Sequence, residues 1–219
     1  MTITIDPFIK ETLPDLLLGG FIFDIEVKAS SDDLMKLLND EIKVLEPKLT
    51  PESIREMDTV KANKNAYRAL GKDPNRYRPS AEALLRRVAN GKGLYHINNV
   101  VDILNLISVK TGYSICGYDL DKVEGDIVMG KGQNAEPYEG IGRGELNIEN
   151  LPVFRDDIGA FGTPTSDSVR TMVTDKTTRF LMIIIGFNDR TKIERALDEA
   201  SELYKQFASG KELERFFIS

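Results

Sequence analysis

The pattern of the sequence changes at Gly112, and this change restricts the possible folds more than any other feature. Between residues 30 and 111, apolar residues recur at the three- and four-residue spacing of amphipathic helices. After Gly112, short apolar runs alternate with glycine-containing turns. Helices in the first half and strands in the second predict a mixed α+β (α/β) fold with helices packed on mixed β-sheets. We find no internal repeat and no linker, so we expect a single compact domain over residues 1–219.

Individual elements follow from capping residues, apolar spacing and β-prone runs. The predicted helices cover residues 31–45, 51–70, 80–89, 98–110 and 193–207, and the last of them is expected to close the chain. The predicted strands cover residues 16–27, 113–120, 125–130, 170–174 and 178–187. The first of these strands is expected to be buried and to bend at its glycine pair.

Composition excludes several classes of protein. A net charge of -6 and a pI near 5.0 argue against a protein that coats nucleic acid without specificity, and no DNA partner is expected. One cysteine and one histidine cannot build an internal disulfide or a Cys/His zinc cage. We expect no metal and no cofactor. The N-terminus lacks a signal-peptide pattern, and the longest apolar run, Phe180 to Ile185, is far too short to span a membrane. These features predict a cytoplasmic protein that does not enter a membrane.

One segment of this acidic chain is strongly basic. Residues 61–95 contain nine Lys or Arg and only two acidic residues, a net charge of +7, with Tyr67 and Tyr77 interleaved. A surface that follows RNA phosphates and stacks on bases has this composition. The candidate RNA-binding residues are Arg76, Arg78, Arg86 and Arg87. The same pattern also arises when charges segregate by chance over solvated helix surfaces.

Residues 96–148 carry an ordered set of motifs: an NNVVD helix, a glycine, an aliphatic strand leading to YDLDK, and a G-x-I strand. The matching residues are Asn98, Asn99, Val100, Val101, Asp102, Asn105, Gly112, Tyr118, Asp119, Leu120, Asp121, Lys122, Gly125 and Ile127. This arrangement resembles the tRNA-editing (B3/B4) domain of the phenylalanyl-tRNA synthetase β subunit, here as a free-standing copy. The resemblance covers about residues 65–190, and residues 1–50 and 190–219 are expected to pack on that part.

The resemblance implies an RNA-linked function. In the synthetase, this domain hydrolyses the ester that joins wrongly attached tyrosine to the phenylalanine tRNA. The implied partners are therefore tRNA or aminoacyl-tRNA and an amino acid. An aminoacyl ester is already activated, so orientation and charge stabilisation can suffice without a Ser/His/Asp set.

Three positions depart from the polar residues typical of the family. Cys116 stands where a histidine is common, Gly130 where an arginine follows the G-x-I strand, and Ile183 where a glutamate lies in the last strand. Either the activity is lost or other groups have replaced these side chains.

The loop from Gly162 to Thr171 is the densest source of replacement groups. Its hydroxyls, carboxylate and guanidinium are the groups that bind an aminoacyl-ribose or the charged ends of an amino acid. The predicted catalytic residues are Asp167 and Thr163, and the predicted ligand-binding residues are Ser166, Ser168, Arg170, Thr171, Asn99 and Cys116. A capped turn, in which these side chains satisfy backbone amides or Arg170 pairs with Asp167, is the alternative.

Three residues of this region have a structural alternative as well. Cys116 lies in an apolar strand, which favours a buried inert thiol over a nucleophile paired with His96. Asp102 and Asn105 are expected to brace neighbouring loops.

Three functions remain open from the sequence. The leading one is a stand-alone domain that binds aminoacyl-tRNA and hydrolyses mischarged amino acids. The alternative is a non-enzymatic module that binds an amino acid or similar small ligand, and the third is an interaction subunit that keeps only the fold.

Overall fold

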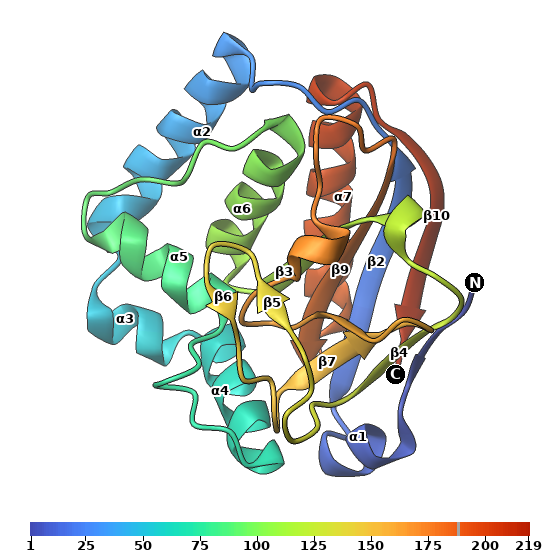
Figure 1. The fold of residues 1–219 in the computed structure, drawn as a ribbon. Helices are drawn as coiled ribbons and strands as arrows, with labels where there is room; N and C mark the ends of the chain where they lie inside the picture. The colour runs from blue at the N-terminus through green and yellow to red at the C-terminus, as the bar shows by residue number, and fades with distance from the viewer. Residues whose placement is uncertain (188) are drawn as a thin grey trace.

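The computed structural model describes residues 1–187 and 189–219 and has a mixed α/β architecture (Figure 1). Its helices are α1 (Pro7–Thr12), α2 (Asp32–Leu45), α3 (Pro51–Glu56), α4 (Asp58–Leu70), α5 (Ser80–Ala89), α6 (Asn99–Thr111) and α7 (Arg190–Phe207). Its strands are β1 (Ile3–Ile5), β2 (Leu16–Asp24), β3 (Ser114–Asp119), β4 (Ile127–Lys131), β5 (Glu139–Gly140), β6 (Gly144–Glu145), β7 (Pro152–Arg155), β8 (Ala160–Gly162), β9 (Arg179–Phe187) and β10 (Lys211–Ile218). Short 3₁₀ turns lie at Glu46–Lys48 (η1), Leu120–Lys122 (η2) and Val169–Thr171 (η3).

The central sheet has the strand order β10-β2-β9-β3, and each neighbouring pair is antiparallel. The glycine pair of β2 allows close packing on both sides of the strand. A Cβ on Gly19 would overlap the side chain of Ile193 in α7, and one on Gly20 would overlap the ring of Phe216 in β10. The structure therefore places this pair in a buried, regular strand.

The second four-stranded sheet, β1-β4-β7-β8, packs on one face of the central sheet, while helices cover the other face. Strand β9 is buried on both faces, which explains its unbroken apolar run. Phe180, Met182 and Ile184 contact the helical core, whereas Leu181 and Ile183 contact the second sheet, as the two-residue period of a strand requires. The molecule thus has three layers (Figure 1).

Most predicted elements are confirmed, and three predictions need correction. The expected helix over 51–70 is two helices, because Met57 adopts an extended conformation between α3 and α4. The expected strand over 170–174 is wrong: the Ser168 side chain accepts a hydrogen bond from the backbone of Arg170 and starts η3 there. The last helix does not close the chain, because β10 follows it and pairs with β2.

The N- and C-terminal segments contribute strands to the sheets and do not only pack on residues 65–190. Strand β2 lies inside the central sheet, and both β1 and β10 pair with strands far away in sequence. This interleaving supports one cooperative unit, and the single domain over residues 1–219 stays a prediction, which coincident unfolding transitions by two probes would test. No helix in the described residues is long and apolar enough to cross a membrane.

Candidate functional site

A pocket of about 260 Å³ lies where the start of α5, helix α6 and strand β3 meet the loop after β8. Its walls are mainly apolar and come from Ile97, Val101, Leu104, Ile115, Gly117, Ile141, Met172, Val173 and Phe180. Three polar residues, Ser80, Asn105 and Asp167, also line it. A mainly apolar pocket with a few polar side chains is the usual form of a small-ligand site.

Asp167 is the most unusual polar group in this pocket. One carboxyl oxygen, Oδ2, accepts a hydrogen bond from the backbone N–H of Gly117 at 3.1 Å. The other oxygen, Oδ1, is buried and has no hydrogen-bond partner among the described residues. Burial raises the pKa of the Asp167 carboxyl to about 7, against the opposing effects of the Gly117 N–H and of the nearby Cys116 and Tyr118 side chains. At neutral pH this carboxyl is therefore a mixture of its charged and neutral forms.

The loop holds Asp167 in place through hydrogen bonds that Thr163 organises. The Oγ1 of Thr163 accepts from the backbone N–H groups of Thr165 and Ser166, at 3.1 Å each, and donates to the Ser166 carbonyl at 3.0 Å. A hydroxyl has one donor and two acceptor sites, so these bonds use its full capacity. The geometry thus gives Thr163 a turn-holding role and leaves it nothing to offer a ligand.

Two buried tyrosines from other parts of the sequence hydrogen-bond to the same loop. The Tyr67 hydroxyl lies 2.9 Å from the Oγ1 of Thr165, and the Tyr138 hydroxyl donates to the Ser166 carbonyl at 2.6 Å. Thr171 is buried and donates to the Phe161 carbonyl at 3.5 Å. These contacts fix the loop before any ligand binds.

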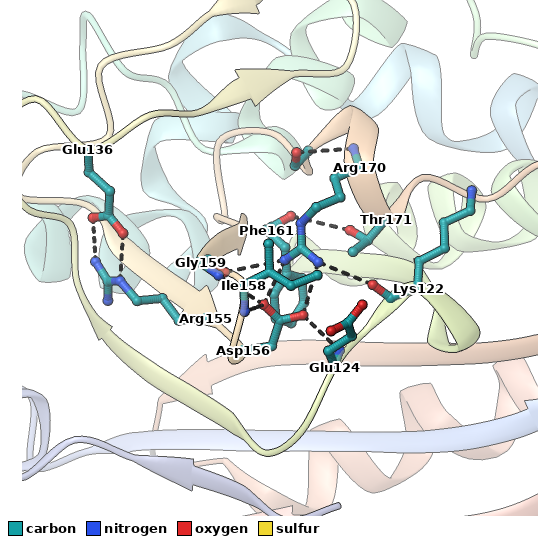
Figure 2. Close-up of polar contacts among 11 residues, drawn as sticks. Lys122, Glu124, Glu136, Arg155, Asp156, Ile158, Gly159, Phe161, Arg170 and Thr171 are labelled. Atoms are coloured by element: carbon teal, nitrogen blue, oxygen red, sulfur yellow. Dashed lines mark hydrogen bonds and ion pairs between the residues drawn. The ribbon is translucent and has the colours of Figure 1, made fainter.

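Arg170 lies away from the Asp167 pocket. Its guanidinium forms a bidentate ion pair with Asp156, with N···O distances of 2.8 and 3.0 Å (Figure 2). It also donates to the carbonyls of Lys122 and Gly159. Burial alone would raise the pKa of Asp156, but hydrogen bonds from Arg170 and from backbone N–H groups hold that pKa below its usual value. The predicted alternative, a pair between Arg170 and Asp167, is therefore wrong, since Asp156 is the partner.

The loop in fact divides its polar groups between two hollows. Ser168 and Arg170 line a second hollow of about 540 Å³, together with Glu136, Tyr138 and Glu145. Ser168 pairs with Gly140 in an isolated β-bridge, and successive residues of an extended chain point to opposite sides. The expectation that all the loop's groups converge on one ligand is thus not met: Asp167 lines one cavity, and Ser168 and Arg170 line the other.

Asn99 and Asp102 are internal braces. The side-chain oxygen of Asn99 accepts from Lys28 N–H at 2.9 Å, and its amide donates to the Glu26 and Phe207 carbonyls at 2.9 Å each. Asp102 accepts from Ser30 and from the backbone of Ile97. Asn105, which was expected to act as a brace as well, instead lines the pocket.

Two of the three departures from the family pattern are neighbours in space, and the third, Gly130, lies beside Arg155. Cys116 and Ile183 are direct partners across β3 and β9, and both lie in the buried cluster between the two sheets. Burial raises the pKa of the Cys116 thiol well above its usual value, which makes it a neutral thiol and a poor nucleophile. At Gly130, a Cβ would lie only 2.9 Å from the Arg155 guanidinium, which pairs with Glu136 at 2.6 Å (Figure 2). An arginine from the neighbouring strand thus occupies the space beside Gly130.

Several basic side chains of residues 61–95 make contacts within the protein. Lys72 is buried and donates to two backbone carbonyls, while Arg76 and Arg87 lie over the rings of Tyr77 and Tyr95. The remaining candidates, Arg78 and Arg86, both approach Glu82. Among residues 1–187 and 189–219, no three His, Cys, Asp or Glu side chains converge as metal ligands would.

Several residues near the site were not predicted. Ser80 and the aliphatic side chains of the pocket come from α5, α6, β3 and three connecting segments, and Asp156 is the partner of Arg170. Only the paired acids that follow β7, Asp156 and Asp157, gave any sequence signal, because such pairs commonly accept hydrogen bonds from turn amides.

Comparison with known proteins gives one family match. The model of the B3/4 domain family matches residues 62–214, which extends past the motifs noted above. No curated protein matches. Among solved structures, an N-terminal fragment of the phenylalanyl-tRNA synthetase β-subunit from Pyrococcus horikoshii is similar, with 14% identity and a TM-score of 0.45. The alignment covers 100% of this chain and 50% of that one, so this chain spans about half the length of the fragment.

Proposed function

This chain belongs to the B3/4 domain family, and from that premise we propose that it binds the aminoacyl end of tRNA with the amino acid in the Asp167 pocket. One observation carries this proposal: Asp167, whose carboxyl has a buried oxygen without a hydrogen-bond partner among the described residues, lines an apolar pocket of about 260 Å³. Leaving such a group unpaired costs about 1–3 kcal/mol, and a donor from a ligand offsets that cost.

The α-amino group of an aminoacyl ester is a suitable donor for Asp167. It is a cation with several N–H bonds, and a charge-assisted hydrogen bond to a carboxylate is stronger than a neutral one. The apolar walls from α6, β3 and β9 would take an aliphatic or aromatic side chain. A volume of about 260 Å³ also suits a ligand of amino-acid size better than a larger cofactor.

Hydrolysis of the ester is the second part of the proposal. A general base works best with a pKa near the operating pH, and the pKa of Asp167 is about 7. In this step the Asp167 carboxylate takes a proton from water, the water oxygen attacks the ester carbonyl, and the ribose oxygen leaves and takes up a proton. The products are a free amino acid and deacylated tRNA.

Binding without hydrolysis is the competing function, and a specific observation favours it. The positions of Cys116 and Ile183, polar in the synthetase family, form an apolar pair buried away from solvent. If turnover required those polar groups, the pocket would bind an amino acid and leave the ester intact.

A deacylation panel separates these functions. Purified protein is given several tRNAs, each mischarged with a different apolar amino acid, at one salt concentration, and free amino acid is measured over time. Release above the spontaneous rate with wild type, and its loss in Asp167→Asn, supports the hydrolase. Calorimetric binding of the same free amino acids without release supports the binding module, and neither release nor binding contradicts both.

A further inference from the structure

Three cations surround one buried carboxylate at the start of α5. Glu82 is only 1% exposed, and its Oε1 accepts from the Nε of Arg86 at 2.9 Å. The Nζ of Lys64 lies 3.4 Å from Oε2, and the Nε of Arg78 lies 3.7 Å from Oε1. The cluster therefore carries a net charge of +2, more positive charge than the burial of one carboxylate requires.

The two arginines keep most of their hydrogen-bonding capacity. A guanidinium has five N–H donors in a planar fork. Within the described residues, Arg86 makes one side-chain hydrogen bond, through its Nε, and Arg78 makes none. The Arg78 side chain is 43% exposed and that of Arg86 is 27% exposed, so both side chains are in contact with solvent.

The cluster is attached to the wall of the Asp167 pocket. Arg78 lies two residues before Ser80, and Ser80 lines that pocket. The Ser80 backbone N–H donates to the Pro164 carbonyl at 2.8 Å. The backbone of Tyr77 accepts from the Oγ1 of Thr165 at 3.5 Å. The chain that carries Arg78 is thus fixed to the same loop that carries Asp167.

We propose that Arg78 and Arg86 bind phosphate groups of the RNA strand whose 3′ end enters the pocket, and that Glu82 positions their guanidinium groups. The choice of RNA as the partner rests on the proposed function. Guanidinium forks match phosphate oxygens in geometry and charge, which an ammonium group does less well. Glu82 is a positioning residue and does not touch the RNA. Arg76 and Arg87, whose cations lie over tyrosine rings, contribute less than Arg78 and Arg86.

The test measures affinity for deacylated tRNA at several salt concentrations. Deacylated tRNA carries no amino acid, so the pocket makes little contribution to this measurement. The double variant Arg78→Gln/Arg86→Gln should bind about tenfold more weakly and lower the salt slope by about 1.5, because each phosphate contact contributes about 0.7 to 0.9. A matched control, Lys43→Gln/Lys205→Gln, removes two exposed lysines that each pair with a carboxylate one turn away, and it should change neither quantity appreciably.

Further variants separate a loss of folding from a loss of contact. Arg78→Gln alone leaves the Arg86–Glu82 hydrogen bond in place and should give about half of the change in slope. Glu82→Gln should weaken tRNA binding while thermal unfolding still shows a single folded state. Equal slopes for wild type and the double variant, an equal effect of the control, or no tRNA binding by wild type at low salt would overturn the inference. If the deacylation and amino-acid binding assays are negative but the variants change tRNA binding as expected, the proposed function is contradicted and the phosphate contacts are supported.

Discussion

Asp156 and Asp167 are two aspartates, eleven residues apart, whose surroundings differ sharply. Asp156 has an arginine partner and accepts from the backbone of Glu124, Ile158 and Gly159 (Figure 2). Among the described residues, Asp167 has a single backbone donor and no cation partner, and its Oδ1 makes no hydrogen bond, although the Cys116 and Tyr118 side chains lie close enough to lower its pKa. The pKa of Asp156 is lowered, whereas burial raises the pKa of Asp167 to about 7. A fully paired aspartate stabilises a fold, and an unpaired one at a pocket is better placed to bind a ligand.

The largest expected effect comes from breaking the Asp156 pair. Arg170→Met keeps much of the side-chain length but leaves the buried Asp156 carboxylate without its cation. Removing one partner of a buried pair typically costs 3–5 kcal/mol, so we expect a loss of about 3 kcal/mol in the free energy of unfolding, measured in urea. A loss below about 1 kcal/mol would show that the backbone donors alone satisfy Asp156.

The pH dependence of stability should have opposite signs at the two aspartates. Asp167 binds its proton more tightly in the folded state, so the stability it contributes is present in acid and is lost as pH rises towards 7. Asp156 has a lowered pKa, so its contribution is present at neutral pH and is lost as pH falls through its folded-state pKa.

This difference is measured by comparing unfolding free energies with those of Asn variants. Relative to wild type, the free energy of unfolding of Asp167→Asn should rise by about 3 kcal/mol between pH 4.5 and pH 8. Asp156→Asn should be destabilised most at neutral pH, because the amide places N–H groups against the donors that now face the carboxylate. A pH-independent difference for Asp167→Asn would refute the raised pKa.

Ligand binding should follow the charge of Asp167. With a pKa of about 7, roughly nine-tenths of the carboxyl is ionised at pH 8 and one-tenth at pH 6. The affinity for an amino acid ester should therefore fall by about tenfold between these pH values. Asp167→Asn should show a flat profile, and a wild-type profile that is equally flat would mean that the charged carboxylate is not the ligand's partner.

The sequence predicted the helical core well because that core depends on local spacing. Leu34, Leu38 and Ile42 recur at helical intervals, and all three are buried. Strand β10 was missed because its sequence, KELERFFI, alternates poorly, and only pairing with β2 makes it a strand.

The sequence identified several polar residues of the candidate site, but it did not predict how their side chains are arranged in space. The 162–171 loop stood out by its density of polar residues, but their directions depend on partners distant in sequence, such as Asp156 for Arg170 and Gly117 for Asp167. The pocket walls come from two helices, two strands and several connecting segments, and the packing of the three layers sets where these meet. No local pattern encodes such a meeting point.

The most direct test of the account compares Asp167→Asn with Asp156→Asn in one assay. Asp167→Asn should lower affinity for an amino acid ester at pH 8 by about tenfold, or about 1.4 kcal/mol, with a melting temperature equal to or above that of wild type. Asp156→Asn should lower the melting temperature and leave the affinity of the folded protein unchanged. If Asp167→Asn binds as tightly as wild type, or loses binding only together with stability, Asp167 belongs to the scaffold and the pocket is not the binding site.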